Sequence, residues 1–191
     1  GMKSMTRTAD ALVVESIRAG YGDGAEVLHG VDLTARAGEV TTLIGPNGCG
    51  KSTLLKAMSK LLAPRAGTVH VSGIDIHSLS AREAARRVAL LPQHPRAPGG
   101  LYVGELVARG RHPHQARMAG LSAADHEAIA RACDATGISD LLEHDIDALS
   151  GGQRQRVWLA MILTQDTPVL LLDEPTTFLD PAHAIDMLSL A

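Results

Sequence analysis

Apolar and polar positions alternate in part near the start of the chain. The segments LVVESIRAGY (12–21) and EVLHGVDLTA (26–35) have this pattern, which is typical of strands with one face exposed to water. They predict an antiparallel β part over residues 12–35. GTVHVSG (67–73) and RRVALLP (86–92) predict further strands.

The next apolar segments predict a strand, a glycine-rich loop and a helix in succession. VTTLI (40–44) predicts the strand, and KSTLLKAMSKLL (51–62) predicts the helix. The apolar residues expected on one face of this helix are Leu54, Leu55, Met58, Leu61 and Leu62.

Residues 100–165 are predicted to be mainly helical. One helix is expected to begin after Ser122 as N-cap, with Asp125 three residues later, and to stop at Gly137. Further on, VLLLDE (169–174) is a continuous apolar run, as expected of a parallel strand covered on both faces. This order predicts one α/β domain with a helical insert.

Composition narrows the classes of partner and compartment. The chain has 191 residues, 45% of them hydrophobic, and a formal net charge of -3, which argues against a nucleic-acid partner. Cys49 and Cys133 form no CxxC motif, so we expect neither a disulfide framework nor a structural metal, and a reducing compartment. Because no apolar run approaches the roughly 18 residues of a membrane span, the chain is not expected to cross a membrane. Residues 1–5, GMKSM, are interpreted as a tag remnant followed by the start.

The loop GPNGCGKST (45–53) carries the most specific chemical signal, because it fits the pattern GxxxxGK[ST] between a predicted strand and a predicted helix. Its glycines allow backbone N–H groups to surround phosphate oxygens, and the helix N-terminus adds partial positive charge. Lys51 is expected to reach the β- and γ-phosphates, and the Ser52 hydroxyl to bind Mg²⁺. The alternative is an ordinary glycine-rich turn. Cys49 within the loop is interpreted as a small residue that fits, the alternative being a thiol made reactive by the helix N-terminus.

Two acidic residues end the apolar run at 169–174. Asp173 is expected to hold Mg²⁺ and Glu174 to polarise an attacking water. The alternative is a strand that ends in solvated acids. These two motifs do not choose a class, because adenylate-kinase-like enzymes and GTPases also have such loops.

The segment ALSGGQRQRVWLA (148–160) distinguishes these classes. LSGGQ resembles the signature motif of ATP-binding cassette (ABC) ATPases. GPNGCGKST resembles the Walker A motif of that family, Gln93 in LLPQ its Q-loop, VLLLDEP its Walker B motif, and LD at 179–180 its D-loop. The resemblance extends from Leu12 onward.

The resemblance implies a P-loop NTPase fold with a RecA-like core around a parallel sheet, an N-terminal antiparallel β subdomain and an inserted helical subdomain. We expect the core and antiparallel β parts at 12–93 and 166–191, and the helical subdomain with the signature at 94–165. Trp158 is interpreted as core of the signature helix, together with Val157, Ala160, Met161 and Thr164.

The resemblance also implies the cofactors ATP and Mg²⁺ and the residues that bind them. Catalytic roles are implied for Lys51, Gln93 and Glu174, and Mg²⁺ binding for Ser52, Gln93 and Asp173. Tyr21 is similar to the aromatic residue that stacks on adenine, the alternative being a Tyr partly buried at a sheet edge. The implied nucleotide contacts are Tyr21, Gly45, Pro46, Asn47, Gly48, Cys49, Gly50, Lys51, Ser52, Thr53 and Asp173, with Ser150, Gly151, Gly152, Gln153 and Asp180 contributed by a second subunit.

Gly151 and Gly152 before a helix form a second potential anion site. One chain that binds one nucleotide does not need two phosphate sites, so the second is expected to serve a nucleotide held by another subunit. The family implies such a homodimer, in which ATP lies between Walker A of one copy and the signature of the other, and in which Gln93 senses the γ-phosphate.

The resemblance favours an importer ATPase over soluble ABC ATPases of DNA repair or translation, which typically have coiled-coil inserts or two cassettes. LVARGRHPHQ (106–115) and LLDEPTTFLD (171–180) resemble the subfamily for ferric siderophore uptake, with haem and vitamin B12 importers as alternatives. The implied partners are two permease subunits and an extracytoplasmic substrate-binding protein, and the implied location is the cytoplasmic face of the membrane. HPH (112–114) is interpreted as permease-facing surface rather than a metal site.

The end of the chain departs from the family pattern. The family's switch histidine lies beyond the D-loop helix, the chain stops at Ala191, and His183 is too early to replace it. We therefore expect a truncated domain that lacks the C-terminal part of the fold, binds nucleotide and hydrolyses it weakly.

Overall fold

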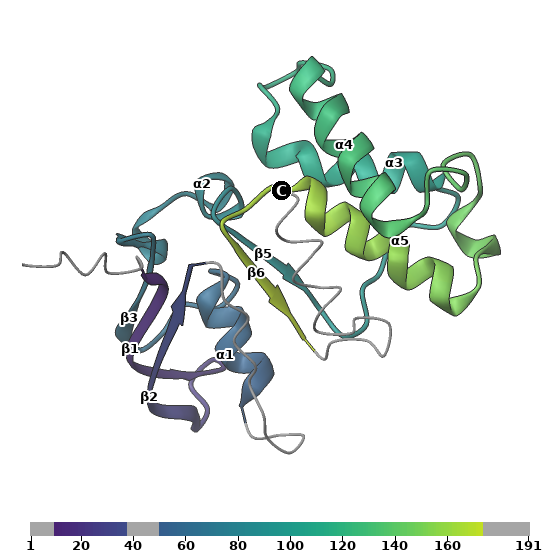
Figure 1. Cartoon of the computed structure of the whole chain (residues 1–191). Helices are drawn as coiled ribbons and strands as arrows, with labels where there is room; N and C mark the ends of the chain where they lie inside the picture. The colour runs from purple at the N-terminus through teal and green to yellow at the C-terminus, as the bar shows by residue number, and fades with distance from the viewer. Residues whose placement is uncertain (1–9, 38–49, 174–191) are drawn as a thin grey trace, which may run out of the picture. The chain divides into compact units, whose positions relative to one another are not determined.

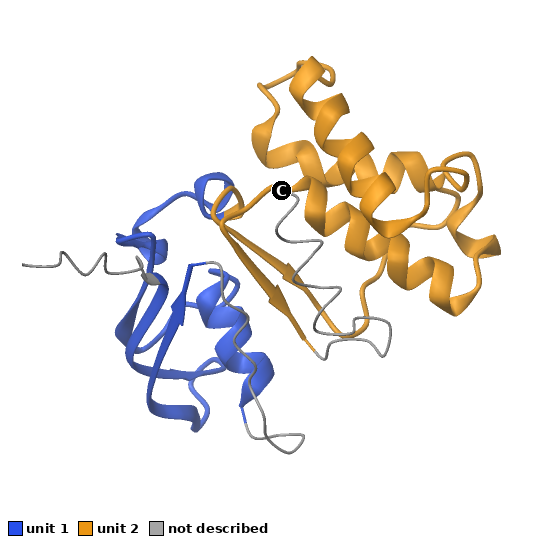
Figure 2. Cartoon of the chain, viewed as in Figure 1, with its two compact units in different colours: residues 1–84 blue, residues 85–191 orange. Residues whose placement is uncertain are grey.

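The computed structural model describes residues 10–37 and 50–173 (Figure 1). The predicted strand at 40–44 lies outside these residues, as do positions 45–49, Glu174, Asp180 and His183. The chain divides into two compact units, unit 1 with residues 1–84 and unit 2 with residues 85–191 (Figure 2). We describe each unit by itself.

Unit 1 contains a four-stranded antiparallel sheet in the order β2-β1-β3-β4. Its elements are β1 (Asp10–Gly20), β2 (Glu26–Arg36), α1 (Lys51–Met58), β3 (Ala66–Val71), β4 (Ile74–Asp75) and the 3-10 helix η1 (Ile76–Ser78). The predicted antiparallel β part is therefore confirmed, and the strand predicted at 67–73 belongs to the same sheet.

Strand β1 keeps one apolar face in spite of an irregularity in its middle. Leu12 and Val14 are buried before the irregularity, and Ile17 and Ala19 after it. The pairing with β2 shifts between Val14 and Ile17, where Ser16 has a φ of 50°. An extra residue of this kind moves the side-chain alternation by one position, which explains why buried positions change from even to odd numbers.

Helix α1 ends four residues earlier than predicted. Leu54, Leu55 and Met58 are buried as expected, whereas Leu61 is 69% exposed and lies outside the helix. Lys60 takes a left-handed conformation with φ 65°, and Leu61 N donates to Lys56 O at 2.8 Å. This is the Schellman arrangement that closes a helix, so the prediction that Leu61 and Leu62 extend the apolar face is wrong.

Unit 2 combines two parallel strands with a group of helices. Its elements are β5 (Val88–Leu91), α3 (Val103–Ala108), the 3-10 helix η2 (Arg109–His114), α4 (Ala123–Thr136), the 3-10 helix η3 (Ile146–Ala148), α5 (Gly151–Thr164) and β6 (Val169–Leu172), and α2 (Ala81–Ala85) lies at the boundary between the units. Strands β5 and β6 pair in parallel, from Val88 opposite Val169 to Leu91 opposite Leu172.

The pairing confirms the predicted parallel strand over Val169–Leu172 of the segment 169–174, whose last residue lies outside the described ones. Val169 and Leu171 are buried, whereas Leu170 and Leu172 are partly exposed. The prediction that both faces of this strand are covered is thus only partly confirmed.

The limits of α4 are set by the residues that the sequence indicated. Ser122 is the N-cap, and its Oγ accepts a hydrogen bond from Asp125 N, while Asp125 Oδ2 accepts one from Ser122 N at 2.8 Å. This is a reciprocal capping box. Gly137 ends the helix in a left-handed conformation with φ 67°.

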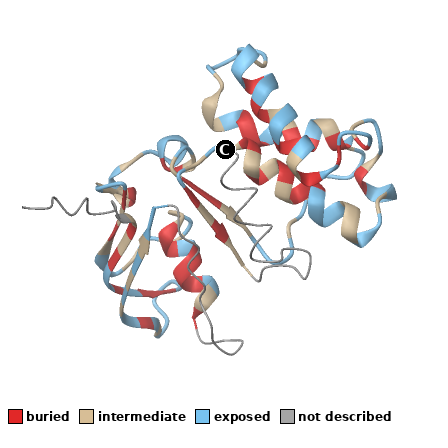
Figure 3. Cartoon of the chain, in the orientation of Figure 1, coloured by how far each residue is buried: buried red, intermediate tan, exposed pale blue. Residues whose placement is uncertain are grey.

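The core of unit 2 lies where α3, α4 and α5 pack together, as the buried residues in Figure 3 show. Trp158 on α5 is 8% exposed and belongs to this core. Val157, Ala160 and Thr164 are buried too, and Met161 packs partly buried against the cluster. The interpretation of Trp158 as a core residue is confirmed. Among the described residues, none of the helices has the length and apolar character that a membrane span needs.

Candidate nucleotide-binding site

Helix α1 begins after an N-cap position that requires glycine. Gly50 is the N-cap, with φ 96° in the left-handed region. A Cβ built there would lie 2.9 Å from Leu28 Cδ2, so a larger residue would be both strained and crowded. Ser52 at the start of the helix is exposed, whereas Thr53 is buried. The helix therefore presents its first turn with the backbone N–H groups that suit an anion.

Tyr21 lies directly after β1, and its ring contacts α1. Tyr21 is 48% exposed as a residue. The hydroxyl shares a hydrogen bond with Thr53 Oγ1 at 3.3 Å, and Lys56 Nζ lies 5.4 Å from the ring centroid. The ring is thus attached to the helix that follows the glycine-rich loop, with surface left for stacking.

Gln93 and Asp173 lie at the same edge of the parallel pair in unit 2. Leu91 and Leu172 are opposite each other at the ends of β5 and β6, and Asp173 N donates to Leu91 O at 3.0 Å. Gln93 follows two residues after Leu91 and is exposed. The carboxyl ends of parallel strands are where ligands bind in open α/β sheets.

The predicted magnesium ligands have suitable chemistry. Ser52 supplies a hydroxyl, Asp173 a carboxylate and Gln93 an amide oxygen, and Mg²⁺ prefers oxygen ligands. Ser52 belongs to unit 1 and the other two to unit 2, so their joint action stays a prediction. Among the described residues, no group of three or more His, Cys, Asp or Glu residues could hold a metal ion.

The turn before α5 is an exposed, capped helix start. Ser150 Oγ accepts a hydrogen bond from Gln153 N at 3.2 Å, and Gln153 Oε1 accepts one from Ser150 N at 2.9 Å. This capping box does not use the N–H groups of Gly151 and Gly152, which occupy the first two helical positions. The space around a Cβ at Gly151 is open to 4 Å. The turn can therefore offer two backbone donors to an anion that approaches from outside.

The structure thus contains three separate pieces of the predicted site. In unit 1, Tyr21 bonds to Thr53 on α1, the helix that Gly50 caps. Gln93 and Asp173 share an edge in unit 2. The turn at 150–153 is the third piece.

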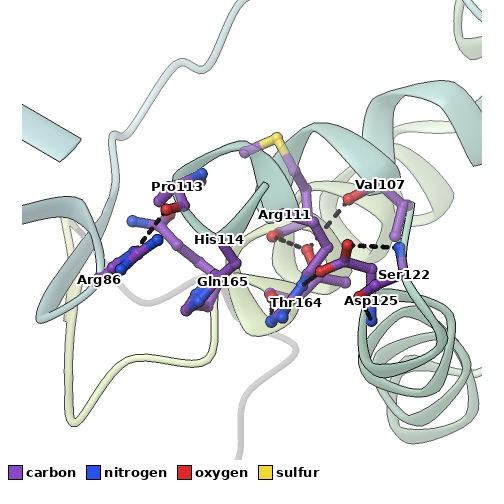
Figure 4. A network of polar contacts seen from close by, with 10 residues as sticks. Arg86, Val107, Arg111, Pro113, His114, Ser122, Asp125, Thr164 and Gln165 are labelled. Atoms are coloured by element: carbon purple, nitrogen blue, oxygen red, sulfur yellow. Dashed lines mark hydrogen bonds and ion pairs between the residues drawn. The ribbon is translucent and has the colours of Figure 1, made fainter. Parts of the chain in front are cut away.

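A buried polar network near residues 109–114 was missed by the sequence reasoning (Figure 4). Arg111 Nε donates to Asp125 Oδ1 at 2.7 Å, and Arg111 Nη1 donates to Thr164 O at 2.9 Å. Hydrogen bonds from Ser122 and from Arg111 lower the pKa of Asp125 to about 2. The RHPH segment gave no signal for this, because Arg111 is a charged residue in a polar stretch and its partner lies 14 positions later.

His114 belongs to the same network. Its Nε2 donates to the carbonyl oxygen of Gln165, and Arg86 Nε donates to Pro113 O at 2.6 Å. His112 is exposed. The ring of His114 is half-buried and held within unit 2, and the interpretation of residues 112–114 as permease-facing surface stays a prediction.

Comparisons with known proteins agree on one family. The model of the ABC transporter family matches residues 28–177. The chain is 49% identical over 181 residues to the iron(3+)-hydroxamate import ATP-binding protein of Bacillus subtilis strain 168, covering 95% of this chain and 67% of that protein. It is 47% identical over 186 residues to the ferric enterobactin transport ATP-binding protein of Escherichia coli strain K12, covering 97% of this chain and 68% of that protein.

A solved structure of the ATP-binding subunit of an ABC transporter has a TM-score of 0.77 and 26% identity, covering 94% of this chain and 72% of that one. The predicted fold class and the predicted resemblance to siderophore importer ATPases are confirmed. The chain spans about two thirds of the length of the curated relatives it matches.

Proposed function

Because the chain belongs to the ABC transporter family, we propose that it binds and hydrolyses ATP as a subunit of an importer for ferric siderophore complexes. The observation that carries this proposal is the 49% identity, over 95% of the chain, to an iron(3+)-hydroxamate import ATP-binding protein. The geometry of the candidate site supports the nucleotide part of the proposal.

In unit 1, the adenine stacks on the exposed ring of Tyr21, whose hydroxyl is joined to Thr53 at 3.3 Å. The glycine-rich loop and the N-terminus of α1 surround the phosphates, and Lys51 neutralises charge on the β- and γ-phosphates. The left-handed Gly50 allows the loop to enter the helix without a side chain between backbone and phosphate.

In unit 2, Gln93 and Asp173 lie at one strand edge and act at the γ-phosphate. Glu174, the next residue, orients a water whose oxygen attacks the γ-phosphorus while the bond to the β–γ bridging oxygen breaks. ADP and inorganic phosphate are the products. Ser52, Asp173 and Gln93 are the residues that would hold Mg²⁺, which would supply positive charge to neutralise the phosphates.

The turn at 150–153 serves a nucleotide held by a second copy of the chain. Gly151 and Gly152 retain backbone donors after the capping box is formed. The GxxxxGK[ST] loop already supplies one phosphate site per chain. The two turns of a head-to-tail homodimer therefore complete two ATP sites, to which Asp180, outside the described residues, contributes as well.

The importer also requires two permease subunits and an extracytoplasmic substrate-binding protein, and this subunit acts at the cytoplasmic face of the membrane. With a formal net charge of -3, the chain has little electrostatic attraction for nucleic acid. This charge disfavours the alternative of a soluble ABC ATPase in DNA repair or translation.

The proposal is tested first by ATP binding to the chain, measured by isothermal titration calorimetry. Lys51→Ala should weaken binding about 10-fold or more, because it removes charge-assisted hydrogen bonds to phosphate. Arg131→Ala, on the exposed surface of α4, is the matched loss of one positive charge and should leave binding unchanged. Equal affinities for ATP in all three proteins would contradict the site.

The cargo is tested in cells of the source organism. Growth on a ferric siderophore as the sole iron source should be lost with Lys51→Ala and kept with Arg131→Ala. If the variant instead loses cobalamin or haem uptake, the assignment of ferric siderophores as cargo is wrong, but the assignment as an importer stands. If it instead loses DNA repair, the assignment as an importer is wrong.

A further inference from the structure

The ring of Tyr21 is held by two side chains of α1. Thr53 Oγ1 hydrogen-bonds to the hydroxyl at 3.3 Å, and Lys56 Nζ lies 5.4 Å from the ring centroid. Thr53 and Lys56 are three positions apart, so they lie on the same face of the helix. Lys56 is exposed, and an ammonium within about 6 Å of a ring centroid is attracted to the ring face.

The backbone beside Tyr21 is held as well. Arg65 Nη2 donates to Gly22 O at 2.8 Å and to Gly24 O at 2.7 Å. The turn is closed by Gly24 N, which donates to Tyr21 O at 3.1 Å. Both the backbone and the ring of Tyr21 thus have fixed positions from contacts within unit 1 alone.

We propose that Lys56 is a positioning residue for the nucleotide base. Its ammonium covers one face of the Tyr21 ring and orients the ring so that the opposite face receives the base. This inference rests on the proposed ATP binding and on Tyr21 as the residue that stacks on the base. Lys56 acts through the aromatic ring and makes no contact with the phosphates.

This role requires a positive charge over the Tyr21 ring. An uncharged hydrogen-bond donor in place of the ammonium does not fulfil it. Lys56→Met keeps the length and the apolar stem of the side chain but removes the charge. Lys56→Arg keeps a cation that also binds aromatic faces. Because Lys56 is exposed and the buried face of α1 is formed by other residues, both variants should fold.

Two ligands separate the base from the phosphates. ATP carries both, and inorganic tripolyphosphate carries the phosphates alone. By calorimetry, Lys56→Met should weaken ATP binding about 2- to 5-fold, the effect expected of an exposed cation–π contact. Tripolyphosphate binding should not change, and Lys56→Arg should bind ATP like the wild type.

A double-mutant cycle with Tyr21 tests whether the effect passes through the ring. In a Tyr21→Ala background, Lys56→Met should cause no further loss of ATP affinity. In a Tyr21→Phe background, which keeps the ring and loses the bond to Thr53, the 2- to 5-fold loss should remain.

Three outcomes would overturn the proposal. Equal weakening of ATP and tripolyphosphate would mean that Lys56 acts on the phosphates, and a loss that persists with Tyr21→Ala would mean that its effect does not pass through the ring. Unchanged ATP affinity in Lys56→Met would mean that Lys56 has no role in the site. If the wild-type chain binds neither ligand, the proposed ATP binding itself fails, which the wild-type titration reveals before any variant is compared.

Discussion

The guanidinium of Arg111 and the carboxylate of Asp125 form an ion pair of 2.7 Å in which both side chains are buried. Arg111 also donates to Thr164 O at the end of α5, and Asp125 accepts from Ser122 N at the start of α4. The pair therefore joins η2, α4 and α5, and Thr164 lies 53 positions after Arg111 in the sequence. The pair and its hydrogen-bond partners compensate two charges whose burial among these helices would otherwise cost free energy.

Asp125→Asn should destabilise the chain by about 3 kcal/mol, because it leaves the buried charge of Arg111 without its counter-ion. The free energy of unfolding in urea, followed by circular dichroism, measures this loss. Glu127→Gln, an exposed change of the same kind on the same helix, should cost less than about 0.5 kcal/mol. A similar small effect for Asp125→Asn would mean that the ion pair does not contribute to stability.

Acid should weaken the wild type more than Asp125→Asn. The pKa of Asp125 is lowered from 3.8 to about 2 in the folded chain, so its contribution is fully present above the unfolded pKa and is lost as the pH falls toward the folded value. The difference in unfolding free energy between the two proteins should therefore be constant above pH ~5 and shrink between pH ~4 and ~2. A difference that stays constant down to pH ~2 would contradict the role of the carboxylate.

Gly110→Ala should disrupt the contact of η2 with α5. A Cβ at this position would overlap Thr164 Oγ1 and Met161 O. Overpacking of this kind should cost at least about 2 kcal/mol in urea unfolding. Gly120→Ala is the control, since its Cβ would meet nothing within 4 Å. Equal stabilities for the two variants would show that η2 moves away without cost.

Ser150→Ala and Gly151→Ala separate the cap of α5 from anion binding. Ser150→Ala removes the acceptor for Gln153 N and should cost about 1 kcal/mol in urea unfolding. Gly151→Ala leaves the cap in place and has open space for its Cβ, so stability should be kept. If the turn binds the nucleotide of a second copy, Gly151→Ala should nevertheless reduce ATP-dependent dimerisation in analytical ultracentrifugation. Unchanged dimerisation would argue against this use of the turn.

The sequence predicted best those features that local chemistry determines. The capping box of Ser122 and Asp125 and the stop at Gly137 could be predicted because the residues that form them lie within one helix. The end of α1 could not be predicted in this way, since the residue that takes the left-handed conformation there is Lys60 and not a glycine. The shift of the side-chain alternation within β1 could not be predicted either, because a serine at position 16 does not indicate a bulge.

The residues of the candidate site likewise fall into two groups, those that a local motif indicates and those that tertiary packing brings together. The glycine-rich loop and the signature turn are contiguous motifs, and the sequence indicated both. The burial of Arg111 depends on Asp125 and Thr164, 14 and 53 positions away. The contact of Lys56 with Tyr21 likewise joins the end of a strand to a helix 35 positions later. Such contacts arise from tertiary packing, which no local pattern encodes.

Trp158 is the single tryptophan of the chain, and it lies in the core of unit 2. Its fluorescence emission therefore reports the packing of α3, α4 and α5 without a tryptophan signal from the β-sheet of unit 1. A comparison of this emission with the circular dichroism of the whole chain during heating would reveal whether the two units melt together or in sequence.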